Sequence, residues 1–111
     1  LMAKLKELAN SNQIIGDIRG KGLLLAAELV ANKETKEMLP VECRGVYRLV
    51  EIGIENGLLL YTRKTSGGVF GEWVMITPAL TINRSEVDEL IDLLRITFLQ
   101  FEKELKSQKY I

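Results

Sequence analysis

Apolar side chains recur at helical spacing at both ends of the chain. Near the start, Leu1, Leu5 and Leu8 fall on one face of a helix, which the polar residues 10–12 bring to an end. Near the other end, a longer stripe predicts a helix over residues 84–107. Its members are Val87, Leu90, Ile91, Leu94, Phe98, Phe101 and Leu105.

The sequence also marks where two helices begin. Asn83, followed three residues later by Glu86, resembles a capping box at the start of the last helix. Pro40 suits the first turn of a middle helix that we expect from Val41 to about Gly57, because glycine there favours a left-handed stop. The apolar residues that recur along this middle helix are Val46, Tyr47, Val50 and Ile54.

Strand-like runs fill the remaining apolar stretches. The runs 58–63 and 72–77 are rich in aliphatic, aromatic and β-branched residues and flank a loop with glycines at 67, 68 and 71, so they predict adjacent antiparallel strands with a flexible tip. A strand begins at Ile14, and the near-continuous apolar run 23–30 predicts a central or doubly covered strand. The predicted fold is α+β, in the order α-β-β-α-β-β-α: a small, mainly antiparallel sheet with helices packed on it.

Composition excludes several function classes. The 111 residues suffice for one domain with a core, and 15 basic and 15 acidic residues give no net charge, which argues against general nucleic-acid binding. The chain has no histidine, so a His-based triad or a His-ligated zinc site is impossible within it. No apolar run approaches the length of a membrane span. A single cysteine rules out an internal disulfide and is compatible with a reducing cytosol. We expect a cytoplasmic protein.

Few residues carry candidate chemistry. Arg63, where the first strand of the ribbon meets its loop, could hold a carboxylate through its planar fork, or could be an ordinary exposed arginine at a strand end. Lys21 and Lys64 lie among glycines and polar residues, whereas a Schiff-base lysine needs desolvation or a cationic neighbour. Cys43 reads as a helix-packing residue, because no histidine is present to activate it. Trp73 most simply packs on the sheet.

The segment IRGKGLL, residues 18–24, is rich in glycine, and glycine-rich loops can cradle phosphate. Dinucleotide and P-loop motifs, however, run from a strand through the loop into a helix, whereas here a strand follows. The segment therefore predicts a kink between two strands that turns Arg19 and Lys21 outward.

Three motifs together resemble the C-terminal small domain of class III aminotransferases. They are IGDIRGKGLLLAAELV, the strand ENGLLLYTRK after the middle helix, and the strand-to-helix junction WVMITPALTINRSEVDELIDLL. The resemblance covers residues 14–105. It implies the small domain of the aspartate-aminotransferase fold, with pyridoxal phosphate as cofactor and amino-group transfer from an amine or amino acid to an oxo acid such as pyruvate.

The resemblance also implies which roles fall to this chain. In the family the Schiff-base lysine and most cofactor contacts belong to a large domain, which would lie upstream of Leu1, so residues 1–111 would be the small domain and inactive alone. The intact enzyme would be a homodimer. The small domain would contribute a cover over the active site and an arginine for the substrate carboxylate. Family members carry that arginine either where this chain has Met75 or where it has Arg63, so the resemblance favours Arg63.

Two departures separate this chain from the family pattern. Pro78 is followed by alanine rather than by a second proline, and the loop 64–71 is long.

The competing hypothesis is a free-standing α+β binding or regulatory module that pairs through its sheet and has no chemistry of its own. The complete reading frame would separate the two, because an upstream segment with a strand-end lysine supports the enzyme.

Overall fold

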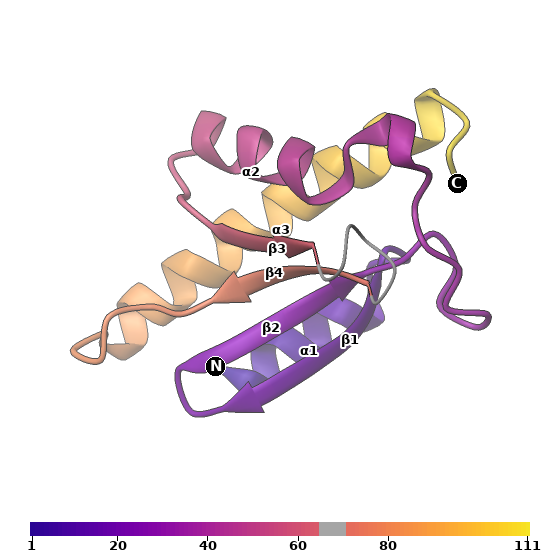
Figure 1. The fold of residues 1–111 in the computed structure, drawn as a ribbon. Coiled ribbons are helices and arrows are strands. Elements are labelled where there is room, and N and C mark those ends of the chain that lie inside the picture. The colour runs from indigo at the N-terminus through magenta and orange to yellow at the C-terminus, as the bar shows by residue number, and fades with distance from the viewer. Residues whose placement is uncertain (65–70) are drawn as a thin grey trace.

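The computed structural model describes residues 1–64 and 71–111, apart from the side chains of Arg63 and Lys64. The elements follow the predicted order (Figure 1). They are α1 (Met2–Asn10), β1 (Ile15–Lys21), β2 (Leu24–Leu29), the short 3₁₀ helix η1 (Val41–Cys43), α2 (Gly45–Glu55), β3 (Tyr61–Lys64), β4 (Glu72–Ile76) and α3 (Arg84–Ser107). The predicted flexible tip of the ribbon, residues 65–70, lies outside the described residues.

The strands form one antiparallel sheet in the order β1-β2-β4-β3. The predicted pairing of the ribbon strands is confirmed, with Tyr61 opposite Met75 and Arg63 opposite Trp73. The prediction that the run 23–30 lies centrally is also confirmed, because β2 pairs with β1 on one side and with β4 on the other.

The glycine-rich segment, predicted to be a kink between two strands, is a tight hairpin between β1 and β2. Lys21 pairs with Leu24 across a two-residue turn, and Gly22 takes the first turn position with a φ of +57°. Hairpin turns of this length favour glycine at a left-handed position because they must match the twist of the strands. Arg19 and Lys21 are both exposed, so the outward direction expected for them is confirmed.

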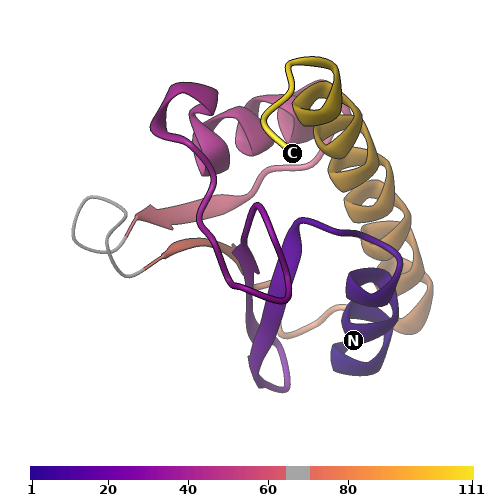
Figure 2. The ribbon, with the colours of Figure 1, turned by 90° about the vertical axis from the view of Figure 1, so that its right-hand side faces the viewer.

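All three helices lie on one side of the sheet. In Figure 1, α1 and α3 lie behind the strands, and in Figure 2 they lie to the right of them, with α2 above. Because successive side chains of a strand point to opposite faces, alternate residues meet these helices. Those buried residues of the sheet are Leu25, Ala27, Leu29, Val74 and Ile76. We call this side the packed face, and the other side the open face.

The last helix has the predicted bounds and the predicted cap. The Asn83 side chain accepts a hydrogen bond from the Glu86 backbone N–H at 2.9 Å, and the Glu86 carboxylate accepts one from the Asn83 backbone N–H at 3.1 Å. The helix buries its predicted stripe against the sheet and α2. The fully buried apolar members are Ile91, Leu94, Phe98, Phe101 and Leu105.

The middle helix differs from its prediction at its start and on its buried face. It begins at Gly45, because Arg44 takes a left-handed conformation, with a φ of +58°, between η1 and α2. The buried apolar face contains Leu49 and Ile52, whereas two members of the predicted stripe, Tyr47 and Ile54, are 49% and 58% exposed. Gly53 sets this rotation, because a β-carbon there would lie 2.9 Å from the Leu58 carbonyl oxygen, so only glycine lets the returning chain approach so closely.

The first ribbon strand is shorter than predicted and begins at Tyr61 rather than at residue 58. Leu58 instead donates its backbone N–H to the Gly53 carbonyl, which ties it to the end of α2. The partner strand β4 ends at Ile76, and Pro78 has no N–H to extend the ladder. The residues before Tyr61 therefore have no strand opposite them to pair with.

Candidate functional site

The predicted substrate residue, Arg63, belongs to β3 near the end of the strand. Its backbone pairs with Trp73 of β4, one strand in from the edge of the sheet. Its side chain lies outside the described residues, so its use as a carboxylate ligand stays a prediction. Met75, the alternative family position for that arginine, pairs with Tyr61 on the same ribbon. The two candidate positions are thus on adjacent strands, two residues apart in register.

Trp73 lies on the open face and supports an arginine from a distant strand. The Arg19 guanidinium lies 5.1 Å from the centre of the Trp73 ring, a distance at which a cation is attracted to an aromatic face. The Arg19 Nε also donates to the Asp17 Oδ2 at 2.5 Å. The prediction that Trp73 packs on the sheet did not include this contact. Residues 19 and 73 come close because β1 and β4 both pair with β2, and the sequence alone does not give this strand order.

The other residues singled out from the sequence do not gather around Arg63. Lys21 is exposed at the end of the β1–β2 hairpin, and the Lys64 side chain lies outside the described residues. Cys43 is buried in η1 and its Sγ donates to the Pro40 carbonyl at 3.0 Å, as expected for a packing residue. The structure therefore assembles no catalytic set from these residues in the part of the chain it describes.

A hollow of about 380 Å³ lies at the end of the ribbon where β3 begins and β4 ends. Its walls are apolar side chains and the Pro78 ring, and they include Leu59, Tyr61 and Met75. Leu59 and Tyr61 are 84% and 62% exposed, which is unusual for such large apolar groups side by side. The only sign of these exposed apolar side chains in the sequence is that residues 58–61 do not alternate strictly between apolar and polar.

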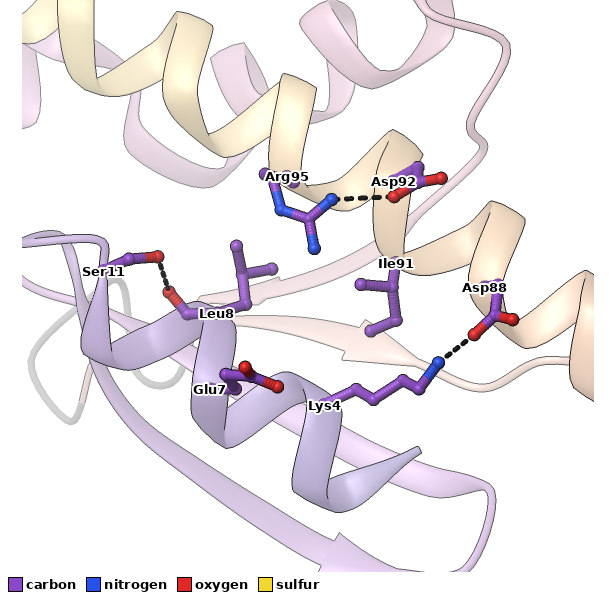
Figure 3. A pocket seen from close by; sticks show the side chains of 8 residues that line it. All are labelled: Lys4, Glu7, Leu8, Ser11, Asp88, Ile91, Asp92 and Arg95. Carbon is purple, nitrogen blue, oxygen red and sulfur yellow. Dashed lines mark hydrogen bonds and ion pairs between the residues drawn. The ribbon is translucent and has the colours of Figure 1, made fainter.

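A second, charged cleft of about 530 Å³ lies between α1 and α3 (Figure 3). Lys4 of α1 pairs with Asp88 of α3, and Arg95 donates to Asp92 at 2.7 Å along α3. Only the Lys4–Asp88 pair crosses from one helix to the other, and the apolar side chains of Leu8 and Ile91 lie between the two pairs in Figure 3. The helical spacing of positions 88, 92 and 95 could have predicted that these charged residues lie on one face of α3. It could not have predicted that Lys4 of α1 pairs with Asp88.

Three titratable groups are shifted by their surroundings. Hydrogen bonds to Glu104 and Glu51 raise the pKa of Arg48, and hydrogen bonds from Arg48 and Arg44 lower the pKa of Glu51. Burial lowers the pKa of Lys33, whose ammonium donates to the Ala9 carbonyl at the end of α1. The Arg48–Glu104 pair joins α2 to α3, and the Lys33 hydrogen bond joins the segment after β2 to the end of α1.

Across residues 1–64 and 71–111, no group of three or more carboxylates and thiols is placed to hold a metal ion. No helix in this part of the chain is long and apolar enough to cross a bilayer.

Comparison with known proteins supports the resemblance found in the sequence. Residues 1–98 match the family described as aminotransferase class-III. The chain is 40% identical over 110 residues to the uncharacterized aminotransferase YodT of Bacillus subtilis, covering 96% of this chain and 24% of that protein. It is 35% identical over 92 residues to the taurine–pyruvate aminotransferase of Rhodobacter capsulatus, covering 83% of this chain and 20% of that one.

The fold matches solved structures as well. A transaminase from the marine bacterium Virgibacillus superimposes with a TM-score of 0.86 and 26% sequence identity, over 94% of this chain and 23% of that chain. The predicted α+β fold is therefore confirmed. The chain spans a quarter or less of the length of the relatives it matches.

Proposed function

The chain belongs to the class III aminotransferase family, and we propose that it is the C-terminal small domain of a longer, pyridoxal-phosphate-dependent aminotransferase. In the intact protein an amino group moves from an amine or amino acid to an oxo acid such as pyruvate. This chain contributes Arg63, which binds a substrate carboxylate, and a cover over the active site. The family match over residues 1–98 favours this function over a free-standing binding module.

The observation that carries the role of Arg63 is its place in the ribbon. The two positions where the family carries the carboxylate arginine are occupied here by Met75 and Arg63, and they lie on paired strands two residues apart in register. An arginine on either strand therefore starts from nearly the same part of the sheet. Its planar guanidinium can donate two parallel hydrogen bonds to a carboxylate.

The described residues do not fit a pyridoxal-phosphate site. The glycine-rich segment is a hairpin between β1 and β2, so it presents no helix N-terminus to a phosphate group. Lys21 is exposed, and Lys33 is engaged with the Ala9 carbonyl beside the carboxylate of Glu102. Bound cofactor supplies the electron sink for amino transfer. The lysine that holds it then belongs to the remainder of the longer protein, and the 111-residue chain alone is inactive.

The assembly and location of the intact protein complete the proposal. The intact enzyme is a homodimer in the cytoplasm, and its partners are a small amine or amino acid and an oxo acid. One curated relative is named a taurine–pyruvate aminotransferase, which supports pyruvate as the first acceptor to try.

A cofactor adduct tests the division of roles. The 111-residue chain and the product of its complete reading frame would each be mixed with pyridoxal phosphate, reduced with borohydride and analysed by mass spectrometry. We expect an adduct at one lysine upstream of Leu1 in the longer protein and none in the short chain. A specific adduct at Lys21 or Lys64 would contradict the assignment, and no adduct on either protein would favour the binding module.

Replacing Arg63→Ala in the intact enzyme tests the carboxylate role. We expect kcat/KM for pyruvate and 2-oxoglutarate to fall by an amount equivalent to about 1.5–3 kcal/mol, the usual contribution of a charged hydrogen bond. Arg63→Lys should recover only part of the loss, because lysine lacks the fork. Arg84→Ala, which removes an exposed arginine at the start of α3, serves as the control. Unchanged kinetics in Arg63→Ala would refute the role.

A further inference from the structure

One buried carboxylate lies on the packed face of the sheet, among apolar side chains. Glu72, the first residue of β4, is 4% exposed and precedes Val74 and Ile76 in the row of side chains that meets the helices. Its neighbour across the ladder in β2 is the fully buried Leu29. A carboxylate in such surroundings loses hydration that an apolar side chain would not need, so the protein must compensate it locally.

The start of α2 supplies that compensation. A β-carbon built on Gly45, the first residue of α2, would overlap the Glu72 Oε2 and lie 2.8 Å from the carboxyl carbon. The carboxylate therefore occupies the space over this glycine, at the N-terminal end of the helix. The first backbone N–H groups of a helix have no partners within the helix, and this end carries a partial positive charge. A negative charge is stabilised at the place where the Glu72 carboxylate lies.

This contact joins α2 to the end of the ribbon that carries Arg63. Within the described residues, the last pair of the β3–β4 ladder is Lys64 opposite Glu72, and the pair before it is Arg63 opposite Trp73. In the part of the chain that the structure describes, β3 is an edge strand with β4 as its one neighbour in the sheet. Because ladder ends open most readily, a contact that holds the start of β4 also holds the backbone of Arg63.

We propose that Glu72 is a positioning residue for the substrate carboxylate: held at the start of α2, it fixes the strand end from which Arg63 binds the substrate. The inference rests on the proposed function of Arg63. Glu72 belongs to the packed face, whereas Arg63 has a register position opposite Trp73, a residue of the open face. Glu72 therefore acts through Arg63. Its loss should weaken substrate binding, and so raise KM, more than it slows the chemical step.

A double-mutant cycle in the intact enzyme tests whether Glu72 acts through Arg63. Glu72→Gln keeps the shape of the side chain without its charge, and it should raise KM for pyruvate about fivefold while kcat changes less than about twofold. In the Arg63→Ala background the same change should have less than about a twofold effect, because residues that act as a unit are not additive. Glu102→Gln, which neutralises another buried carboxylate on α3, is the matched control and should change KM less than about twofold.

Amide hydrogen exchange gives a second readout that does not depend on activity. Glu72→Gln should speed the exchange of β3 and of the first residues of β4 about threefold or more, while exchange around the buried Leu94 of α3 stays unchanged. Gly45→Ala should have the same effect on β3, because its new methyl group displaces the carboxylate without removing its charge. It is the variant to use if Glu72→Gln does not fold.

Several outcomes would overturn the positioning role alone. They are an unchanged KM for pyruvate in Glu72→Gln, an equal effect of that change in the Arg63→Ala background, and exchange that rises throughout the fold. Failure of both Glu72→Gln and Gly45→Ala to fold would also overturn it, since Glu72 would then support the whole domain. In each case Arg63→Ala still judges the proposed function. If Arg63→Ala itself leaves the pyruvate kinetics unchanged, the carboxylate role and the positioning role fail together.

Discussion

The two faces of the sheet differ although they share the same strands. Val74 is fully buried on the packed face, whereas its neighbour Met75 is only half-buried on the open face. The three helices of residues 1–64 and 71–111 cover the first face, and no element within these residues covers the second. The packed face therefore carries most of the buried apolar side chains of the sheet, whereas the open face, with Trp73 and the backbone of Arg63 in its rows, is left exposed or half-buried.

The two faces therefore differ in how much their side chains contribute to the stability of the isolated chain. Burial of apolar surface stabilises a fold only where the chain can exclude water by itself. On the packed face Phe98 and Phe101 do so, each 1% exposed. On the open face the large side chains Leu24 and Tyr61 remain mostly in water, so the isolated chain gains little from them.

The largest effect we expect comes from a deletion on the packed side. Phe98→Ala should lower the free energy of unfolding of the chain by about 3–5 kcal/mol, because it leaves a cavity between α3 and the sheet. Leu99→Ala, its half-exposed neighbour on the outer side of α3, should change it by less than about 0.5 kcal/mol. Urea titrations followed by circular dichroism would measure both. Similar losses for the two variants would contradict the assignment of the packed side.

A pair of neighbouring residues in β4 compares the two faces directly. Val74→Ala should cost about 2 kcal/mol of unfolding free energy, since it removes two fully buried methyl groups. Met75→Ala should cost under about 1 kcal/mol in the 111-residue chain, because its side chain is only half-buried. Equal losses for the two variants would contradict the assignment of Val74 and Met75 to a packed and an open face.

The smallest effect that we expect is on the pH dependence of the unfolding free energy, to which the burial of apolar side chains does not contribute. Glu51 accepts hydrogen bonds from the Arg48 Nη1 at 3.1 Å and the Arg44 Nη2 at 2.8 Å, and these lower its pKa from the ordinary value of 4.5. A lowered pKa means that its contribution is present above about pH 4.5 and is lost as pH falls through the lowered value. Unfolding measured between pH 6 and 2.5 should therefore show a shallower acid decline for Glu51→Gln than for the unaltered chain.

Arg44→Gln serves as the graded variant for that experiment. It removes one of the two donors to Glu51 and should give an acid decline between those of the unaltered chain and Glu51→Gln. Arg48 and Glu104 remain paired in both variants, at 2.8 Å between Nε and Oε2, so the contact of α2 with α3 is retained. Identical acid profiles for all three proteins would show that these exposed pairs contribute nothing measurable.

Local sequence determined the elements whose causes are local. The bounds of α3 and its cap followed from the stripe that ends at Leu105 and from Asn83 with Glu86, because helical period and capping depend on residues three or four apart. The break between two strands in residues 18–24 followed from their glycines, and the structure shows it to be a hairpin turn at Gly22. The resemblance in three motifs predicted the family and the fold, which the comparisons confirmed.

Tertiary structure decided the features that depend on distant partners. The buried face of α2 was set by the close approach of Leu58 to Gly53, and the start of β3 by the end of β4 before Pro78. The contact of Arg19 with Trp73 required strands 54 positions apart in sequence to lie in one sheet. The open face could not be predicted at all, because exposure depends on which faces the helices cover, and periodicity alone does not specify that.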